Sequence, residues 1–503
     1  MNWKHGYFAE SGYTYGFYVE ASPARLQWAA LLQGIHAPTE NYRYLDLGCG
    51  QGFHLLQLAA LHPNSDFVGI DFMPEHIAHG RYLARAAGLS NVTFIEGDFI
   101  EWSNSTDSLG VFDYVIAHGI TTWVSSEVRT ALFQLASLVL KPGGLMYNSY
   151  NTQPGWLSMA PFQNLVLEFQ KQSNGKDAIG SAQQVMSKIH DLGGDLFKVI
   201  PDLQQQLQAL GGKDPAYLVQ EYKHEFWEPM YSNRMLDLAY QHKLQLLSSA
   251  TLPEIFDESY TPEIRQLISE QKDPILRETV KDLLSAQAFR RDIYVKGAFR
   301  RWKRLSEREL LAQRFLHTNR AQPSQSDDFI FEAGNKRITG NNILCNALLD
   351  GCGQHGASVA DLLGHNPTVD RNSILRIISL LVHGGWLSFE GTGDSSKAKA
   401  LNHAVTEAIL DGAPYAYLCC SKLSQAIKLP NLDMMLIGLV ANFSDHAEFK
   451  HMLLHHMDAL GIRFSIDGTA VEDPQEKNRK ADMAIDEFHK ARYPYYKWAG
   501  AID

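Results

Sequence analysis

A short apolar segment that runs directly into three alternating glycines restricts the fold of this chain more than any other feature. The segment is YLDLGCGQG, residues 44–52, and its glycines are Gly48, Gly50 and Gly52. Because glycine has no Cβ, it permits a tight turn and lets a ligand approach the backbone at a helix N-terminus. The segment therefore predicts a strand, a ligand-binding turn and a helix.

The region from Arg43 to about Asn151 alternates short apolar runs with segments of helical length. The runs include YRYLDLGCG, DFVGID, NVTFIEGD, FDYVIAHG and GGLMYNSYN, and helices are predicted over residues 54–62, 75–88 and 127–140. This alternation is typical of a doubly wound parallel sheet. We expect an α/β fold with a mainly parallel, Rossmann-like sheet, helical inserts and a mostly helical C-terminal region.

The remaining chain is predicted to add inserts to this sheet and then further units. LQLLSSATL and RRDIYVKGAF are expected to return as strands, with a small helical insert over about 252–286 between them. EDPQEKNRKAD, near the end of the chain, is expected to be a solvated loop. The expected divisions are a ligand-binding core (1–155), a helical insert (156–230), the return to the sheet (231–305), a linker helix and loop (306–335), a winged-helix-like domain (336–400) and a C-terminal helical domain (401–503).

The predicted winged helix has two possible uses, DNA binding and packing. Its expected recognition helix, residues 372–382, has a long apolar face and few basic residues, which favours packing.

Charge and cysteine content exclude several classes of function. The chain has 503 residues and a net charge of −11, so nucleic acid and anionic membranes are unlikely partners on electrostatic grounds. Five cysteines without a C-x-x-C pair argue against a disulfide framework and a metal site. No stretch of 18 apolar residues and no signal peptide are present, so we expect a cytoplasmic protein.

Acidic residues follow the next two predicted strands. Asp71 ends DFVGID nineteen residues after Gly52, and Asp98 lies in EGDF at the end of the third strand. A carboxylate at the position of Asp71 can accept both hydroxyls of a ribose. A nicotinamide enzyme is the alternative, although its glycine pattern is GxGxxG. A P-loop is excluded, because no G-K-[ST] follows the glycines.

These residues resemble the class I S-adenosylmethionine-dependent methyltransferases. The resemblance implies S-adenosylmethionine as cofactor and S-adenosylhomocysteine as product, with Gly48 and Gly50 at the methionine part, Asp71 at the ribose, and Asp98 and Phe99 at the adenine. N-terminal aromatics would close over the cofactor or form a packing pair. The complete expected cofactor set is Tyr13, Tyr15, Asp46, Gly48, Gly50, Asp71, Phe72, Asp98, Phe99, Ala117 and His118.

A closer resemblance covers residues 13–301. FDYVIAHGITTWV, NSYNTQPGW, YLVQEYKHEFWEPMY and FRRDIYVKG, with YTY and SPARL, resemble bacterial methyltransferases that have a regulatory domain, among them the rickettsial-type protein-lysine methyltransferases. The resemblance implies a protein lysine as acceptor and permits a homodimer. A small-molecule or glycan acceptor is the first alternative. A cofactor-binding regulatory protein that works through the winged helix is the second.

The candidates for catalysis lie where the fourth and fifth strands end, because open α/β sheets bind ligands at that edge. They are His118, Trp123, Tyr150 and Asn151. His118 could be a general base or a hydrogen-bond partner of the site, and the two aromatics could line the acceptor site or the core. N-P-P-Y is absent, which argues against DNA adenine methylation. Glu221 and Glu225 could draw in a lysine or form a solvated helix face with Lys223 and Arg234.

Overall fold

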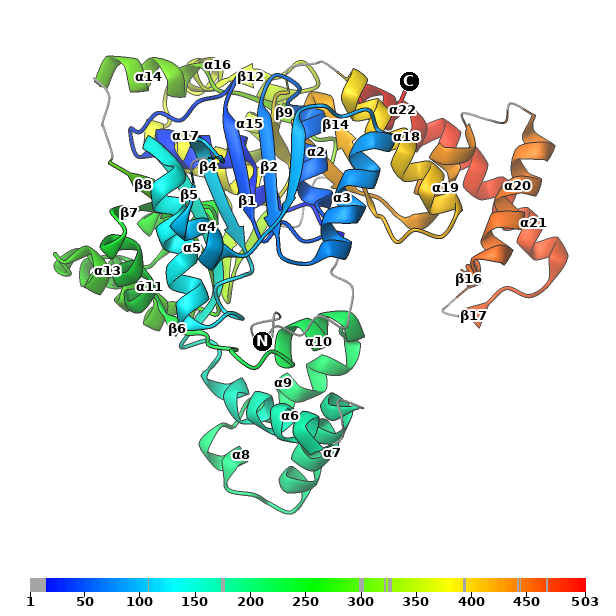
Figure 1. Ribbon diagram of the computed structural model, residues 1–503. Coiled ribbons are helices and arrows are strands. Elements are labelled where there is room, and N and C mark those ends of the chain that lie inside the picture. The colour runs from blue at the N-terminus through cyan, green and yellow to red at the C-terminus, as the bar shows by residue number, and fades with distance from the viewer. Residues whose placement is uncertain are drawn as a thin grey trace.

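The structure of the protein is a computed structural model (Figure 1). It describes residues 15–106, 108–172, 177–297, 303–320, 323, 328–391, 395–440, 443, 445–466 and 469–503. Of the expected site residues, Tyr13 lies outside these ranges. Within them, no helix is both long and apolar enough to cross a membrane.

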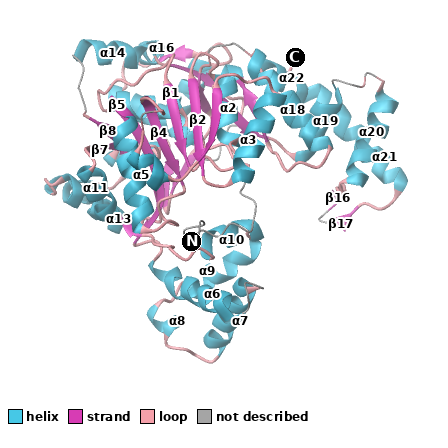
Figure 2. Cartoon of the chain, viewed as in Figure 1, coloured by secondary structure: helices cyan, strands magenta, loops and turns pink. Residues whose placement is uncertain are grey.

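A twisted central sheet organises the first part of the chain (Figures 1 and 2). Its strand order is β3-β2-β1-β4-β5-β8-β7, and β6 pairs with the end of β5. The strands are β1 (Arg43–Leu47), β2 (Asp66–Asp71), β3 (Val92–Glu96), β4 (Phe112–His118), β5 (Leu140–Gln153), β6 (Met230–Tyr231), β7 (Leu244–Ser249) and β8 (Phe289–Lys296).

The first five strands are parallel, and β8 is antiparallel to both β5 and β7. The predicted doubly wound, mainly parallel sheet is confirmed. The two segments expected to return to it do so as β7 and β8.

Helices cover both faces of the sheet. On one face lie α1 (Pro23–Leu32), α2 (Phe53–Leu61) and α3 (Pro74–Ala86), and on the other lie α4 (Phe99–Asn104), α5 (Ser126–Val139) and α11 (Ser232–Gln241). Successive strand residues point to opposite faces. Tyr44 accordingly packs in the cluster around α2, whereas its neighbour Leu45 packs in the cluster around α5.

Between β5 and β6 the chain leaves the sheet and forms a helical lobe, which Figure 1 shows below the sheet. The lobe has its own hydrophobic core, which includes Phe162, Val166 and Met186. β6 pairs with Thr152 and Gln153, so the lobe returns to the sheet at the carboxyl end of β5. Its helices are α6 (Ala160–Gln172), α7 (Ala178–Asp191), α8 (Leu196–Val199), α9 (Leu203–Ala209) and α10 (Pro215–Tyr222).

A second insert connects β7 to β8. It consists of η4 (Leu252–Ile255), η5 (Asp257–Ser259), α12 (Pro262–Glu270) and α13 (Pro274–Ser285). Thr261 and Asp273 cap the two α-helices, and each cap is followed by a proline at the first helical position. These start signals explain why a helical insert could be predicted here from the sequence.

The segment expected to be a linker, residues 306–335, is largely regular structure where it is described. It contains most of α14 (Lys303–Ala312), all of β9 (Arg314–His317) and β10 (Ile330–Ala333), which forms a hairpin with β11 (Lys336–Thr339). Phe329 and Phe331 of this segment are buried and meet Trp386 edge to face. The expected helix is α14, and the expected loop is wrong only where β9 and β10 are described; most of the stretch AQPSQSDD lies outside the described residues.

Residues 342–389 hold three helices and two short strands that pair with β9. The elements are α15 (Asn342–Cys352), β12 (Ala357–Ser358), α16 (Val359–His365), α17 (Arg371–His383) and β13 (Leu387–Phe389). The identification of this part as a winged helix stays a prediction. α17, the expected recognition helix, buries its apolar face, and Ser379 on it accepts a hydrogen bond from Trp28 Nε1 of α1 at 2.9 Å.

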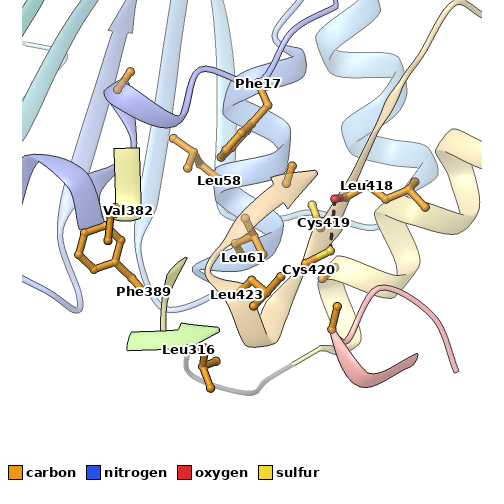
Figure 3. Packing of buried hydrophobic residues seen from close by; sticks show 14 of the residues in the cluster. Phe17, Leu58, Leu61, Leu316, Val382, Phe389, Leu418, Cys419, Cys420 and Leu423 are labelled. Carbon is orange, nitrogen blue, oxygen red and sulfur yellow. Dashed lines mark hydrogen bonds between the residues drawn. The ribbon is translucent and has the colours of Figure 1, made fainter. Parts of the chain in front are cut away.

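Residues 396–428 pack on the α2 face of the sheet, whereas residues 446–487 lie farther from it (Figure 1). Figure 3 shows Leu58 and Leu61 of α2 in one cluster with Leu418 and Cys419 of β14. The elements are α18 (Ser396–Leu410), β14 (Tyr417–Cys420), β15 (Gln425–Lys428), α19 (Asn431–Val440), α20 (His446–Ala459), β16 (Ser465–Ile466), β17 (Thr469–Ala470), α21 (Pro474–Glu487) and α22 (Tyr493–Trp498).

The charged stretch EDPQEKNRKAD was expected to be a loop, and that prediction was wrong. It begins α21, whose N-cap Asp473 accepts a hydrogen bond from Glu476 N at 2.8 Å. The Asp-Pro pair at the helix start is a cap signal that the charge pattern obscured.

Candidate active site

The glycine-rich turn connects β1 to α2, as predicted. Gly48, Gly50 and Gly52 all have positive φ angles, of 77°, 53° and 73°. A Cβ on Gly48 would collide with the side chain of Ile120. Only glycine therefore fits between the backbone of the turn and Ile120.

Asp71, at the end of β2, holds this turn in place. Its carboxylate accepts hydrogen bonds from Gly50 N at 2.8 Å and from Met73 N at 2.9 Å, and His76 Nδ1 lies 3.2 Å from Oδ1. The side chain is 6% exposed. Asp71 thus joins the glycine turn to the start of α3, and its expected role at a ribose stays a prediction.

A small pocket lies directly beside the turn. Three of the expected cofactor residues line it, namely Asp46, Gly48 and His118. Sequence reasoning missed the other lining residues, which are Gly16, Tyr18, Cys49, Gln51, Phe53 and His54. Tyr18 stacks on His118 with ring centroids 3.8 Å apart.

The expected place of Tyr13 and Tyr15 at the cofactor follows from the family resemblance, and Tyr13 lies outside the described residues. Tyr15 packs instead among Phe53, His79 and Tyr415, and its ring centroid lies 5.0 Å from that of Tyr415. The YTYGFY run indicated that an aromatic would reach the pocket, but it did not indicate which one.

Asp46 places a buried carboxyl with a raised pKa in the pocket. It is 5% exposed, and burial together with the nearby Asp71 carboxylate raises its pKa to about 7. A cationic group bound beside Asp46 would stabilise its charged form. The pocket is therefore suited to a positively charged ligand.

His118 is a neutral part of the pocket wall. Its Nδ1 lies 3.0 Å from Tyr147 Oη and 3.1 Å from Ser149 Oγ, and burial lowers its pKa to about 4. An imidazole with such a low pKa is a weak base at neutral pH. The geometry favours the second interpretation of His118, a hydrogen-bonding residue of the site.

The other expected cofactor residues lie around the turn rather than in the pocket lining. Asp98 caps α4 and accepts a hydrogen bond from Ile100 N at 2.6 Å. Phe99 follows it, and its ring lies near Gly48. Phe72 follows β2 and is half-buried. Ala117 points into the hydrophobic cluster on the α5 face of the sheet.

A second group of residues gathers at the carboxyl ends of β4 and β5. Asn151 Nδ2 donates a hydrogen bond to Glu221 Oε1 of α10 at 2.5 Å. Trp227 Nε1 donates to the same carboxyl oxygen at 3.3 Å, and Trp123 Nε1 donates to the Glu221 backbone carbonyl at 3.4 Å. The lobe thus brings the Glu221 carboxyl and the Trp227 indole to Asn151, and Trp123 reaches Glu221 from the connection between β4 and α5.

Glu221 is buried, with 5% of the residue exposed, and burial raises its pKa to about 7. The expected alternative, a solvated face shared with Glu225, is wrong for Glu221. α10 ends at Tyr222, so Glu225 lies beyond the helix and is exposed.

This second group adjoins the pocket. Ser149, which contacts His118, and Asn151 are two residues apart on β5, so their side chains share one face of the strand. Two residues span about 7 Å along a strand.

Tyr150 lies on the opposite face of β5. It is fully buried, and its hydroxyl donates to Asp292 Oδ2 at 2.7 Å. Of the two interpretations of this residue, the structure supports the core aromatic and contradicts a place in the acceptor site. The alternation of side chains along β5 is the physical reason.

No three His, Cys, Asp or Glu side chains of the described chain are grouped so that they could hold a metal ion. Residue chemistry at the site therefore concerns the pocket, the carboxyls and the aromatics.

Comparisons with known proteins identify two parts of the chain. Residues 38–200 match the family model described as a methyltransferase domain. Residues 214–296 match the model described as a predicted methyltransferase regulatory domain.

Two curated proteins are similar over the N-terminal part. An uncharacterized protein of Synechocystis is 34% identical over 302 residues, which is 59% of this chain and 59% of that protein. An uncharacterized protein of Rickettsia prowazekii is 28% identical over 57% of this chain and 52% of that protein. The chain thus spans between half and three-fifths of the length of these relatives.

Among solved structures, PKMT2 from Rickettsia typhi in complex with AdoHcy has the same fold. The two chains are 18% identical, the match covers 96% of this chain and 99% of that one, and the TM-score is 0.68. The similarity therefore includes the C-terminal half, where sequence resemblance was weak.

The pocket fits S-adenosylmethionine by its own chemistry. The glycine turn lines the pocket, and the buried Asp46 carboxyl beside it suits a cationic sulfonium. Residues 38–200 therefore form an S-adenosylmethionine-dependent methyltransferase domain, and a predicted methyltransferase regulatory domain follows it over residues 214–296.

Proposed function

We propose that the chain methylates the side-chain amine of lysine in a protein. The observation that carries this proposal is the buried Glu221 carboxyl, which Asn151 and Trp227 hold at the carboxyl end of β5. The sequence resemblance of residues 13–301 to rickettsial-type protein-lysine methyltransferases supports the same acceptor.

A lysine acceptor needs a site that attracts an ammonium ion and then removes its proton. S-adenosylmethionine supplies a methyl group activated by its sulfonium, so the protein has to supply alignment and an uncharged amine. The Glu221 carboxylate attracts the ammonium, and the indoles of Trp123 and Trp227, whose N–H groups donate to Glu221, lie beside it.

Glu221 is also the candidate general base. Its pKa of about 7 lies roughly 3 units below that of a free lysine, which corresponds to about 4–5 kcal/mol for proton transfer. Desolvation against aromatic walls lowers the pKa of the amine and narrows this gap. Glu221 would accept the proton on a carboxyl oxygen, and Asn151 would act as a positioning residue that fixes that carboxyl.

The neutral His118 and Ser149 complete the wall between the cofactor pocket and this acceptor site. Because Ser149 Oγ and Tyr147 Oη both contact His118 Nδ1, the imidazole has a fixed orientation. We assign it to binding and alignment rather than to proton transfer.

The test is a search for labelled products. The purified chain is incubated with isotope-labelled S-adenosylmethionine and with lysate separated into protein and small-molecule fractions, and products are analysed by mass spectrometry. We expect label on lysine side chains in the protein fraction. Label confined to small molecules or glycans would overturn the proposal, and the absence of labelled product with duplex DNA binding would favour a regulatory protein.

A further inference from the structure

A second cavity lies away from the cofactor pocket, between β7, the insert that follows it, and β11. Its volume is about 220 Å³, which is below the roughly 300–1,000 Å³ of sites for drug-sized ligands and suits a smaller molecule. Apart from Gln33 and Lys336, its lining residues belong to the segment that matches the regulatory-domain model. The cavity shares no lining residue with the pocket beside Gly48.

Charges of both signs line this cavity in equal number. The cations are Arg277, Lys281, Arg290 and Lys336, and the anions are Glu254, Asp257, Glu278 and Asp282. Several of them pair with one another, as Arg290 does with Asp282 at 2.6 Å and Lys281 does with Glu278 at 3.3 Å. A balanced wall of this kind does not favour a ligand with a large net charge of either sign.

Three buried polar atoms of the lining residues have no hydrogen-bond partner within the described part of the chain. They are Ser248 Oγ, Asp257 Oδ1 and Asp282 Oδ2. Asp282 is 4% exposed. A buried carboxylate oxygen without a donor is costly, so these atoms indicate a place for a ligand that donates hydrogen bonds.

Lys336 provides a positive charge in the cavity, opposite to the charge of the carboxylates. Its Nζ lies 3.7 Å from the ring centroid of Tyr260, and it also contacts the Tyr260 hydroxyl. Burial lowers its pKa to about 8. No carboxylate of the described residues lies within ion-pair distance of this ammonium, which leaves it able to bind an anionic group of a ligand.

From these features we infer that the cavity binds a small zwitterion of the α-amino acid class. Its ammonium would donate to the free oxygens of Asp257 and Asp282, and its carboxylate would pair with Lys336. This site goes beyond methyl transfer and does not depend on which acceptor the enzyme uses.

The experiment is calorimetry on the full chain with each of the twenty standard L-amino acids. Saturating AdoHcy is present throughout, since the cofactor pocket itself would hold an amino acid moiety. We expect saturable binding of at least one amino acid, and we expect its N-acetyl derivative and its amide to bind at least about tenfold more weakly, because each lacks one charge. If none of the twenty binds, the inference is wrong.

Variants test whether the amino acid binds in this cavity. Lys336→Met removes the ammonium and keeps the aliphatic stem against Tyr260, so it should weaken binding at least about tenfold. Ser248→Ala removes only an unpartnered hydroxyl, and we expect a smaller loss with an unchanged melting temperature. Lys272→Met, an exposed lysine of the same insert, is the control. Binding that Lys336→Met and Ser248→Ala leave unchanged would place the ligand elsewhere and overturn the inference.

Discussion

Asn151 Nδ2 and Glu221 Oε1 lie 2.5 Å apart and join the carboxyl end of β5 to the last turn of α10 across seventy residues of sequence. Both side chains are buried, at 3% and 5% exposed. The helical lobe thus brings a buried carboxyl to the carboxyl end of β5, and the proposed function makes it part of the active site.

Replacement of this carboxyl tests its role as a base. Glu221→Gln keeps the size and the contact with Trp227 but cannot take up a proton at neutral pH. We expect kcat for protein methylation to fall about 10²- to 10⁴-fold. Calorimetry should show unchanged AdoHcy affinity, because Glu221 does not line the cofactor pocket.

Glu225→Gln is the matched control, since Glu225 is exposed and lies beyond α10. It should keep wild-type turnover. The wild-type rate should also rise with pH through about 7, where Glu221 loses its proton, and Glu221→Gln should lack that limb. An equal loss of turnover in Glu221→Gln and Glu225→Gln would indicate an effect of negative surface charge and would contradict a general base at Glu221.

Some features of this site could be predicted from the sequence, and others could not. The glycine turn after the first core strand, Asp71 at the end of the second and the alternation of strands and helices could be predicted, because strand and turn signals are local. The meeting of Asn151 with Glu221 could not, since it depends on how a seventy-residue insert folds back. The helical period placed Glu221 and Glu225 on one face, but it did not show that the helix ends at Tyr222.

In the C-terminal half, too, contacts between distant residues could not be predicted from the sequence. The aromatic residues Phe329 and Phe331 lie in a polar segment, and only their packing on Trp386 reveals a hairpin where the composition indicated a linker. In the N-terminal segment, Tyr15 and Tyr18 are three residues apart, yet only Tyr18 stacks on His118. Tertiary contacts decided both cases, and a single sequence does not record them.

Asp71 should be essential for the cofactor site. Asp71→Asn loses the negative charge that accepts from Gly50 N and Met73 N, and we expect AdoHcy affinity to fall about 10- to 100-fold, as for hydrogen bonds to a charged group. Asp66→Asn at the exposed start of β2 is the control. Unchanged affinity by calorimetry in Asp71→Asn would remove Asp71 from the site.

Asp46 should make the binding of the two cofactor forms respond differently to pH. Its pKa of about 7 is that of the free pocket, and a cationic sulfonium favours the carboxylate. Binding of S-adenosylmethionine below pH 7 therefore releases a proton, so its affinity should rise with pH by up to about tenfold per unit until pH 7. AdoHcy, with an uncharged sulfur, should show a smaller rise.

In Asp46→Asn, the affinities for S-adenosylmethionine and for AdoHcy should depend on pH in the same way. If wild-type affinity for S-adenosylmethionine is flat between pH 5.5 and 8, roughly the range over which such a group titrates, Asp46 does not face the sulfonium.

Tyr150 and Trp123 should behave differently from each other. Tyr150→Phe removes a buried hydrogen bond to Asp292 and should lower the free energy of unfolding by about 1–3 kcal/mol. Its AdoHcy affinity and its methylation rate at low temperature should stay near those of the wild type. Trp123→Phe removes the contact with Glu221 and should depress turnover with little change in stability. A turnover defect confined to Tyr150→Phe would reverse these assignments.

The C-terminal region should contribute to cofactor binding through Tyr415. Its hydroxyl lies 2.7 Å from His79 Nε2, and His79 Nδ1 lies 2.6 Å from the backbone carbonyl of Gln51 in the glycine turn. Its ring also stacks on Phe53, at 4.9 Å between centroids, and Phe53 lines the pocket. A residue from the last hundred is therefore linked to the glycine turn through His79 and packs on Phe53 at the start of α2.

Tyr415→Phe removes the hydrogen bond and keeps the stacking, so AdoHcy affinity should fall about two- to tenfold, the range for one neutral hydrogen bond. Tyr415→Ala removes both contacts and should cause a larger loss together with a lower melting temperature. Tyr240→Phe, at a tyrosine that is 67% exposed on α11, controls for the loss of a hydroxyl. One result would contradict this prediction: wild-type AdoHcy affinity in Tyr415→Phe, with only a lower melting temperature in Tyr415→Ala. The link through His79 to Gln51 would then contribute nothing to AdoHcy binding. The C-terminal region would stabilise the fold without shaping the pocket.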